Sequence, residues 1–254
     1  MLIAITRQVS PAISQCKLTY LERVPINLDV ARLQHQQYED ALRAVGVEVH
    51  SLPAEPDLPD SVFVEDTAIV LDECAVIARS AADSREPETA SIVRTLEPHR
   101  RLFFIHPPGT LDGGDMLCIG KAIYVGLTSR SNPEAIVQLQ GFLAPYGYAV
   151  KGVIVTGCLH LKSGVTQVAT DTLLVNPAWV GRAEFLDMNF INVDPSEPYA
   201  ANAVLIGEMI IYPAAFPKTR ARLEEAGIPM LIVDASELAK AEGAVTCCSL
   251  IFKA

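Results

Sequence analysis

Apolar and polar residues follow one another in an order that predicts a helix, then a strand, then a pair of strands. The first helix is expected to begin at Asp29, because apolar residues recur at helical spacing after it and Gly46 supplies a stop. Residues 47–53 alternate between apolar and polar side chains, which predicts a strand. After a polar turn, residues 62–70 and 75–78 are expected to form a hairpin.

The same order of elements recurs along the rest of the chain. Further helices are expected at residues 87–96, after Asn132 and Pro133, at 183–188 and at 219–226. Single strands are expected at residues 102–105, 150–155, 190–193 and 230–233. Strand pairs are expected at residues 116–119 with 122–125, 165–169 with 172–175, and 203–206 with 209–212, and Cys247 is expected to open a last strand.

A polar or thiol residue stands at the corresponding place in every unit, namely at Asp66, Asp112, His160, Asn202 and Cys247. These residues recur about every 45 positions, a period typical of propeller-like arrays. Because each unit also contains a helix, a standard all-strand propeller is excluded. We therefore predict an α/β protein in which residues 1–254 form a single domain of five repeated units.

The last predicted strand lacks a partner after it in the sequence. Residues 2–5 are apolar, and no basic leader precedes them, so they are expected to be a strand rather than part of a signal peptide. That strand would pair with the one beginning at Cys247 and close a ring. In a closed ring of equivalent units, corresponding positions point at the central axis, so we expect convergence of Asp66, Asp112, His160 and Cys247.

Composition and charge narrow the class of protein. Half of the residues are hydrophobic and a fifth are charged, as in ordinary soluble globular proteins, and no apolar run approaches the roughly 18 residues of a membrane helix. The formal charge of −10 argues against nucleic acid as a partner and would mildly attract a cationic small molecule. The six cysteines show no metal spacing and no disulfide framework, which favours a reducing cytoplasm.

The adjacent residues Cys247 and Cys248 allow two interpretations. Neighbouring cysteines cannot easily form a disulfide with each other, because disulfide geometry constrains the backbone too tightly. They could be a buried pair of small hydrophobic residues. Alternatively, one of them is a nucleophile that depends on a distant histidine.

The other candidate residues also have ordinary explanations. Asp60, Glu65 and Asp66 could be turn and strand-end residues, and His160 could be a hydrogen-bonded core histidine. Leu111-Asp112-Gly113-Gly114-Asp115 could be a glycine turn, and it lacks the spacing and the lysine of a phosphate-binding loop. None of the other histidines pairs at metal-ligand spacing, so no metal site is predicted.

If these residues do converge, they suit one kind of chemistry. A thiol beside an imidazole can become a nucleophilic thiolate, and the imidazole can pass a proton to a leaving group. Buried carboxylates need a cationic partner, and a planar guanidinium pairs well with them. The residues by themselves therefore favour attack by a thiolate on the carbon of an amidine or guanidine.

Five motifs occur in order from the first unit to the last: Ser61-Val62-Phe63-Val64-Glu65-Asp66, Leu111-Asp112-Gly113-Gly114-Asp115, His160-Leu161-Lys162-Ser163, Ala200-Ala201-Asn202 and Thr246-Cys247-Cys248-Ser249. Together they resemble the dimethylarginine dimethylaminohydrolase (dimethylargininase) family of guanidino-group-modifying enzymes. The resemblance covers nearly the whole chain. It implies the five-bladed α/β-propeller, or pentein, fold and an enzyme that needs no cofactor.

The resemblance also implies a mechanism. Cys247 matches the nucleophile that attacks the guanidinium carbon of an Nω-methylated arginine. His160 would protonate the departing methylamine or dimethylamine and later activate water, and Asp112 would orient His160. Hydrolysis of an S-alkylthiouronium intermediate would then release citrulline.

Further residues match the family's contacts to its cationic amino-acid substrate. Asp66, with Glu65 beside it, would bind the guanidinium group. Arg85 and Arg130 match the pair that binds the α-carboxylate, and Phe63 would pack on the alkyl chain. Contacts around the α-amino group are implied for Leu18, Asp60 and the backbone near Ala241 and Glu242. Leu18 lies in residues 16–27, a stretch without strong helical or strand signals that we interpret as a lid.

The sequence departs from the family pattern at several positions, and alternatives stay open. Asp112 stands where some bacterial members carry Glu, and Glu242 stands where Asp is usual. Arginine deiminases and amidinotransferases of the superfamily have a carboxylate where Lys162 stands, so this lysine favours the methylarginine interpretation. Alternatives are a hydrolase of free arginine or citrulline, a non-catalytic binder of arginine-like amino acids, and a structural metal protein. A homodimer is also left open.

Overall fold

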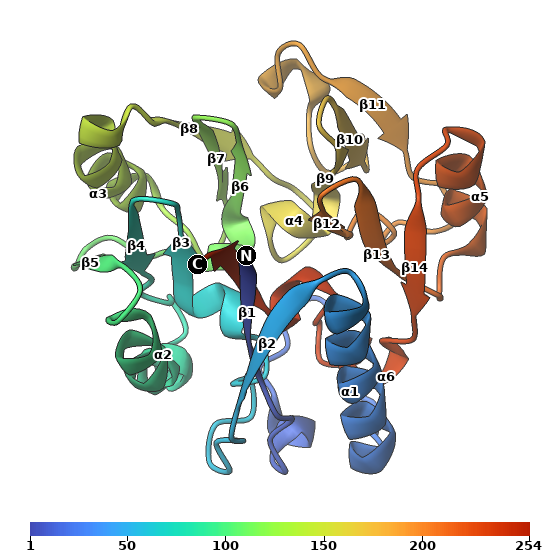
Figure 1. The fold of residues 1–254 in the computed structure, drawn as a ribbon, viewed down its shortest axis with the longest axis horizontal. Coiled ribbons are helices and arrows are strands. Elements are labelled where there is room, and N and C mark those ends of the chain that lie inside the picture. The colour runs from blue at the N-terminus through green and yellow to red at the C-terminus, as the bar shows by residue number, and fades with distance from the viewer.

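A computed structural model describes residues 1–254, and it contains five three-stranded sheets arranged around a centre (Figure 1). Each sheet has an inner strand antiparallel to a middle strand, and the middle strand is parallel to an outer one. The inner strands are β3 (Ala68–Val70), β6 (Met116–Ile119), β9 (Val165–Ala169), β12 (Val204–Ile206) and β15 (Leu250–Lys253). The middle strands are β4 (Cys74–Ile77), β7 (Ala122–Leu127), β10 (Thr172–Val175), β13 (Met209–Pro213) and β1 (Leu2–Arg7). The outer strands are β5 (Arg101–Phe104), β8 (Ala149–Ile154), β11 (Asn189–Asn192), β14 (Met230–Val233) and β2 (Val47–Leu52).

The inner strands surround the central axis. Residues of all five of them line one cavity of about 220 Å³, and among these residues are Val70, Leu117, Gln167, Leu205 and Ile251. The predicted repeat of five units is therefore confirmed. The turns that precede the inner strands are brought to the same end of this axis.

The ring is closed by the first and last strands, as the sequence predicted. β15 pairs antiparallel with β1, with Leu2 opposite Lys253 and Ile5 opposite Leu250. Both termini accordingly lie near the centre of the molecule (Figure 1). This pairing joins the two ends of the sequence into one sheet and satisfies the edge that the inner strand of the fifth unit would otherwise expose.

Helices connect the middle and outer strands in four of the five sheets. They are α1 (Leu28–Ala44), α2 (Thr89–Leu96), α3 (Pro133–Leu143) and α5 (Pro217–Glu225). The expected cap of α3 is confirmed, because the Asn132 side chain accepts the Ala135 amide and Pro133 opens the helix. Two shorter helices, α4 (Leu161–Gly164) and α6 (Ser236–Ala239), lie in loops. None of these helices combines the length and the apolar character that crossing a membrane requires.

Short 3₁₀ helices complete the secondary structure. They are η1 (Ile13–Gln15), η2 (Val64–Thr67), η3 (Asp83–Glu88), η4 (Gly113–Asp115), η5 (Ala144–Tyr146), η6 (Arg182–Glu184) and η7 (Thr246–Cys248). In the fourth unit, η6 replaces the helix expected at residues 183–188. There Phe185 is buried against Tyr124, and Asp187 adopts a positive φ of 60°, which does not continue a helix.

Two strands begin later than their apolar residues predict. The expected strand at residues 62–70 first forms the turn η2, where the Asp66 amide donates to the Phe63 carbonyl, and the strand starts only at Ala68. Cys247 likewise lies in η7 rather than in a strand, because the Cys247 amide donates to the Ala244 carbonyl. In both places an apolar run folds into a turn whose side chains are buried between units.

The closure of the ring can be tested in the core. Ile5 is fully buried and packs in a cluster that includes Ala75, Leu250 and Phe252. Replacing a buried isoleucine by alanine typically costs about 2–5 kcal/mol, so Ile5→Ala should lower the free energy of unfolding by that amount in urea denaturation. Ile154→Ala is the matched control, because that side chain is 70% exposed. Equal effects of the two substitutions would contradict a central role for the β1–β15 pairing.

Candidate active site

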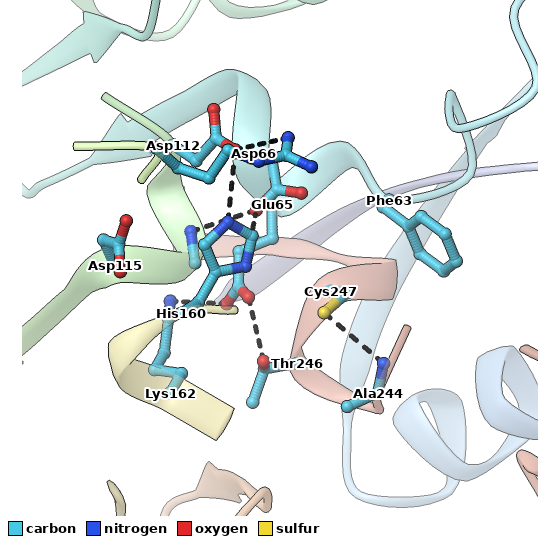
Figure 2. Close-up of polar contacts among 12 residues, drawn as sticks. Phe63, Glu65, Asp66, Asp112, Asp115, His160, Lys162, Ala244, Thr246 and Cys247 are labelled. Atoms are coloured by element: carbon cyan, nitrogen blue, oxygen red, sulfur yellow. Dashed lines mark hydrogen bonds and ion pairs between the residues drawn. The ribbon is translucent and has the colours of Figure 1, made fainter. Parts of the chain in front are cut away.

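The recurring residues of the sequence lie in the turns that precede the inner strands. Asp66 lies in η2, Asp112 precedes η4, His160 precedes α4, and Cys247 lies in η7. η2 packs against both η4 and η7, and α4 packs against η4. Figure 2 shows His160 beside Asp66 and Asp112, with Cys247 on a neighbouring turn.

These turns enclose a cavity of about 10 Å³, which is the space of about one water molecule. Nine of the twelve residues selected from the sequence line it: Asp60, Phe63, Asp66, Arg85, Arg130, His160, Ala241, Glu242 and Cys247. The others in the lining are Lys17, Leu159 and Gly243. The thiol and the imidazole therefore face one common space, although they are far apart in the sequence.

His160 lies between two buried carboxylates. Its Nε2 is 3.1 Å from Asp112 Oδ2, and its Nδ1 is 3.8 Å from Asp66 Oδ1. Burial lowers the pKa of His160, but the charges of Asp66, Asp115 and Asp112 and the hydrogen bond to Asp112 outweigh it and raise the pKa to about 9. His160 is therefore an imidazolium at neutral pH and can donate a proton.

Arginine side chains neutralise the same two carboxylates. Arg85 Nη1 lies 2.5 Å from Asp66 Oδ2, and Arg130 Nη1 lies 3.3 Å from Asp112 Oδ2. Arg85 also forms a forked contact with Glu88, at 2.9–3.2 Å. Burial opposes the ionisation of Asp66, but His160 and Arg85 prevail and lower its pKa to about 2. Asp66 and His160 thus form an ion pair inside the protein.

The sulfur of Cys247 is buried in an acidic environment. Burial raises the pKa of this thiol above its ordinary value, and the Glu65 and Asp66 charges raise it further. The only direct donor to the sulfur is the Ala244 amide, at 3.4 Å. The thiol is consequently protonated at neutral pH. Cys248, the next residue, does not line the cavity and packs into a hydrophobic cluster.

Three of the selected residues do not line the small cavity. Asp112 lies behind His160, and Leu18 is half-buried against the hydrophobic core. Glu65 faces the larger central cavity, where it contacts Lys162 Nζ at 2.5 Å and Thr246 Oγ1 at 2.8 Å. A role for Glu65 beside Asp66 in binding the guanidinium stays a prediction, and the Glu65 side chain does not line the small cavity. Glu65 instead joins the turns η2 and η7 to α4.

The backbone of the Leu111–Asp115 motif runs so close to η2 and to His160 that its two glycines leave no room for a side chain. A Cβ atom on Gly113 would lie 2.0 Å from the Glu65 carbonyl oxygen, and one on Gly114 would lie 2.6 Å from His160 Nδ1. Any side chain here would force η2 and His160 away from η4. The glycine turn is real, and its function is to let the chain pass directly beneath the imidazole.

Two buried acids, Asp115 and Glu88, have contacts that were not predicted from the sequence. Asp115 accepts hydrogen bonds from Thr128, Ser131 and the Leu161 amide, which fixes the residue that follows His160. Its place after two glycines was a usable signal. Glu88, the partner of Arg85, lies in a polar run with no such signal. Only the fold brings it to the guanidinium.

One group of side chains has the geometry to hold a metal ion. Ligand atoms of Asp66, Asp112 and His160 lie within 4.8 Å of one another. A metal would have to compete with Arg85 and Arg130, whose guanidinium groups contact the same carboxylates. The ligands are therefore already engaged in ion pairs within the protein.

Solved structures share this architecture. A DDAH from Pseudomonas aeruginosa, solved as a cysteine-to-serine mutant complexed with citrulline, is similar with a TM-score of 0.94 and 33% identity, and 98% of each chain is covered. The N-terminal domain of ArgZ, an arginine dihydrolase, has a TM-score of 0.84 at 18% identity, covering 98% of this chain and 97% of that one. At that identity the second likeness shows the fold alone.

Sequence comparison identifies the family. A model described as N,N dimethylarginine dimethylhydrolase, eukaryotic, matches residues 14–174. The N(G),N(G)-dimethylarginine dimethylaminohydrolase of Pseudomonas aeruginosa is 36% identical over 86% of this chain and 87% of its own length. That of Streptomyces coelicolor is 36% identical over 97% and 95%. Fold and sequence together define a hydrolase with the five-bladed α/β-propeller, or pentein, fold. The chain belongs to the dimethylarginine dimethylaminohydrolase family.

The ion pair of His160 can be measured directly. Among the groups that raise the pKa of His160, Asp66 contributes most. In wild type, the imidazole protons should titrate near pH 9 by NMR, and Asp66→Asn should lower that midpoint by more than about 1 unit, which is a tenfold change in the ionisation constant. Asp187→Asn, on the surface of the fourth unit, is the control and should leave the midpoint unchanged. An unshifted midpoint in Asp66→Asn would contradict the pairing.

Proposed function

We propose that this enzyme hydrolyses Nω-methylated arginines, asymmetric dimethylarginine and monomethylarginine, to citrulline and dimethylamine or methylamine. The observation that carries the proposal is the common cavity of Cys247 and His160, with Asp66 beside the imidazole. Membership of the dimethylarginine dimethylaminohydrolase family supports the substrate class. The complex of the Pseudomonas aeruginosa relative with citrulline supports the product.

The proposed first half of the reaction forms a thioether-like bond and releases the amine. When the cationic substrate binds, the Cys247 thiol releases its proton to solvent, and the resulting thiolate attacks the guanidinium carbon to give a tetrahedral adduct. His160, protonated at neutral pH, gives a proton to the methylated nitrogen. The carbon–nitrogen bond then breaks, and a neutral amine leaves. The product of this half is a covalent S-alkylthiouronium on Cys247.

The second half returns the enzyme to its starting state. His160, now neutral, removes a proton from a water molecule as that water attacks the thiouronium carbon. The adduct collapses, the carbon–sulfur bond breaks, and the hydroxyl proton of the adduct passes to the departing sulfur, so that Cys247 is again a thiol and His160 is again an imidazolium. The oxygen from water becomes the ureido oxygen of citrulline. Asp112 would hold the imidazole in orientation through the 3.1 Å contact to Nε2, leaving Nδ1 for proton transfer.

The charge balance around the cavity supports a cationic substrate. Six buried carboxylates surround the site: Asp60, Glu65, Asp66, Glu88, Asp112 and Asp115. The cations that pair with them are Arg85, Arg130, Lys162 and protonated His160. Six negative and four positive groups leave an excess of two negative charges when all are ionised, and of one when Glu88, whose pKa burial raises to about 7, is protonated. A guanidinium beside Asp66 would reduce this excess, and it would also favour the thiolate form of Cys247.

We further propose how the amino-acid end is held. Arg85 and Arg130 would bind the α-carboxylate, since both line the cavity. Leu18, Asp60 and the backbone at Ala241 and Glu242 would surround the α-amino group, while Phe63 would pack on the alkyl chain. Lys162 is occupied by Glu65 and does not line the cavity. Arginine deiminases and amidinotransferases carry a carboxylate at the position of Lys162. Because this chain has a lysine there, no such carboxylate would restrict the space for N-methyl groups.

We also propose that the chain is a single domain and is located in the cytoplasm. The pairing of the first strand with the last supports a single domain over residues 1–254. All six cysteines are free, which supports a reducing cytoplasmic location. A homodimer stays a prediction.

The substrate assignment predicts the outcome of a comparison at equal concentration. With asymmetric dimethylarginine, arginine and citrulline, the enzyme should release dimethylamine and citrulline far faster than ammonia or ornithine, with products identified by mass spectrometry. Cys247→Ser should reduce turnover by more than about 10³-fold, because an alcohol is a much weaker nucleophile than a thiolate, while ligand binding persists. Cys248→Ser is the adjacent control and should keep most activity.

Two other results would replace this assignment. A preference for arginine or citrulline would make the chain a different hydrolase. Binding of all three ligands without turnover by the wild type would favour a non-catalytic binder.

The acidic setting of Cys247 predicts how its reactivity depends on pH and on charge. Because burial and nearby carboxylates raise the pKa of Cys247, alkylation by neutral chloroacetamide should accelerate only above about pH 8.5, the ordinary thiol value. Chloroacetamidine has the same size and carries a positive charge, so it should react at least about tenfold faster at pH 7. Peptide mass mapping distinguishes Cys247 from Cys248. Similar pH profiles for both reagents, with a thiolate already formed below pH 7, would be inconsistent with this environment.

A further inference from the structure

The side chain of Glu242 contacts the expected lid rather than the interior of the cavity. Its Oε1 accepts the amide of Thr19 at 3.0 Å, that of Tyr20 at 2.5 Å and that of Leu21 at 2.7 Å. Its Oε2 accepts the Thr19 amide at 3.0 Å. Three successive backbone amides therefore converge on one carboxylate, an arrangement that forms an anion-binding concavity in the chain. The partners are more than 200 positions apart in the sequence.

The backbone at Glu242 makes this contact more informative. Glu242 has a φ of +59°, which lies in the left-handed region. Glycine adopts this conformation readily and asparagine and aspartate tolerate it, but it is unfavourable for most other residues. Such conformations persist when surrounding interactions hold them in place. The hydrogen bonds to the lid are interactions of that kind, and they depend on the carboxylate that a glycine would lack.

The other contacts of residues 17–21 with the site involve residues proposed to bind substrate. The Lys17 amide donates to Asp60 at 3.1–3.2 Å, and Arg130 Nη2 donates to Thr19 Oγ1 at 3.4 Å. A ligand bound by Asp60 and Arg130 would change both contacts. The carboxylate of Glu242 contacts only lid amides, so it can hold the segment whether or not the site is occupied.

The size of the cavity shows why this segment has to move. Lys17 and Glu242 both line the cavity, which has room for about one water molecule. An amino acid with a guanidinium group is many times larger than this space. Residues 17–21, of which Lys17 lines the cavity, must therefore separate from the turn at Glu242 before a ligand enters, and return afterwards.

We propose that Glu242 is a positioning residue that latches residues 17–21 over the active site. The carboxylate sets how much of the time the site is closed, and through that closure it aligns Leu18 and Thr19 with the amino-acid end of the substrate. The expected effect on KM rests on the proposed function. The effect on lid closure does not, because it concerns only contacts within the protein.

Proteolysis and thiol alkylation measure how often residues 17–21 move away from the site, and neither assay requires turnover. In the free enzyme, Glu242→Ala should speed trypsin cleavage after Lys17 and Arg23, and alkylation of Cys247 by iodoacetamide, by about fivefold or more, because both report the open population. Glu242→Gln, which keeps one acceptor oxygen without the charge, should fall between Glu242→Ala and wild type. For dimethylarginine, Glu242→Ala should raise KM about tenfold and change kcat by less than about threefold.

Two further variants separate a latch from a general loss of structure. Tyr20→Pro removes one amide donor from an exposed lid residue, so it should speed cleavage and alkylation as Glu242→Ala does. In the variant that carries both substitutions, the free-energy effects on lid opening should sum to no more than the two single effects added together. Glu225→Gln, at an exposed position of α5, is the control and should match wild type in every assay.

Each outcome bears on the proposal. Cleavage and alkylation rates in Glu242→Ala that equal those of wild type would overturn the latch. Faster cleavage and alkylation in a protein that turns over no methylarginine would establish the latch and overturn the proposed function.

Discussion

The antiparallel pairing of β15 with β1 is the constraint on which the rest of the molecule depends. It joins the fifth unit to the first, so that all five inner strands point along one axis and the turns before them meet at one end. Without this pairing, η7 would have no fixed position relative to η2, and Cys247 would not face His160. A repeat architecture buries its core only between neighbouring units, so the last unit needs a partner to be stable.

The convergence of these turns creates an electrostatic problem that the site resolves internally. Carboxylates are costly to bury unless each meets a cation or several hydrogen-bond donors. Here Asp66 meets Arg85, His160 and the Gly114 amide, while Asp115 is held by three donors. The carboxylates beside His160 keep it protonated, while burial, followed by the charges of Glu65 and Asp66, keeps Cys247 neutral. The resting site thus holds a protonated imidazole and a neutral thiol.

Different acidic residues contact His160 and the segment at residues 17–21. Asp66 and Asp112 contact His160, whereas Glu242 is directed toward the backbone of the lid. Glu65 points away from the cavity and connects α4 to η7 through Lys162 and Thr246. This division of tasks could not be read from the residue types, because each is an ordinary carboxylate near an apolar run. It follows from the direction in which each turn presents its side chain.

Much of the fold is determined locally, and the sequence alone indicated it. The spacing of Asp66, Asp112, His160, Asn202 and Cys247, the cap at Asn132 and the alternating strands require only neighbouring residues, so five units and a closed ring were predictable. The sequence also indicated which residues would meet, because equivalent positions of a ring share an axis. Tertiary structure decided the rest. The turns η2 and η7 replaced strands because buried contacts between units outweigh the strand preference of apolar residues. Glu88 reached Arg85, and Glu242 reached the lid, only through folding, because hydrogen bonds and ion pairs between distant segments leave no periodic trace in the sequence.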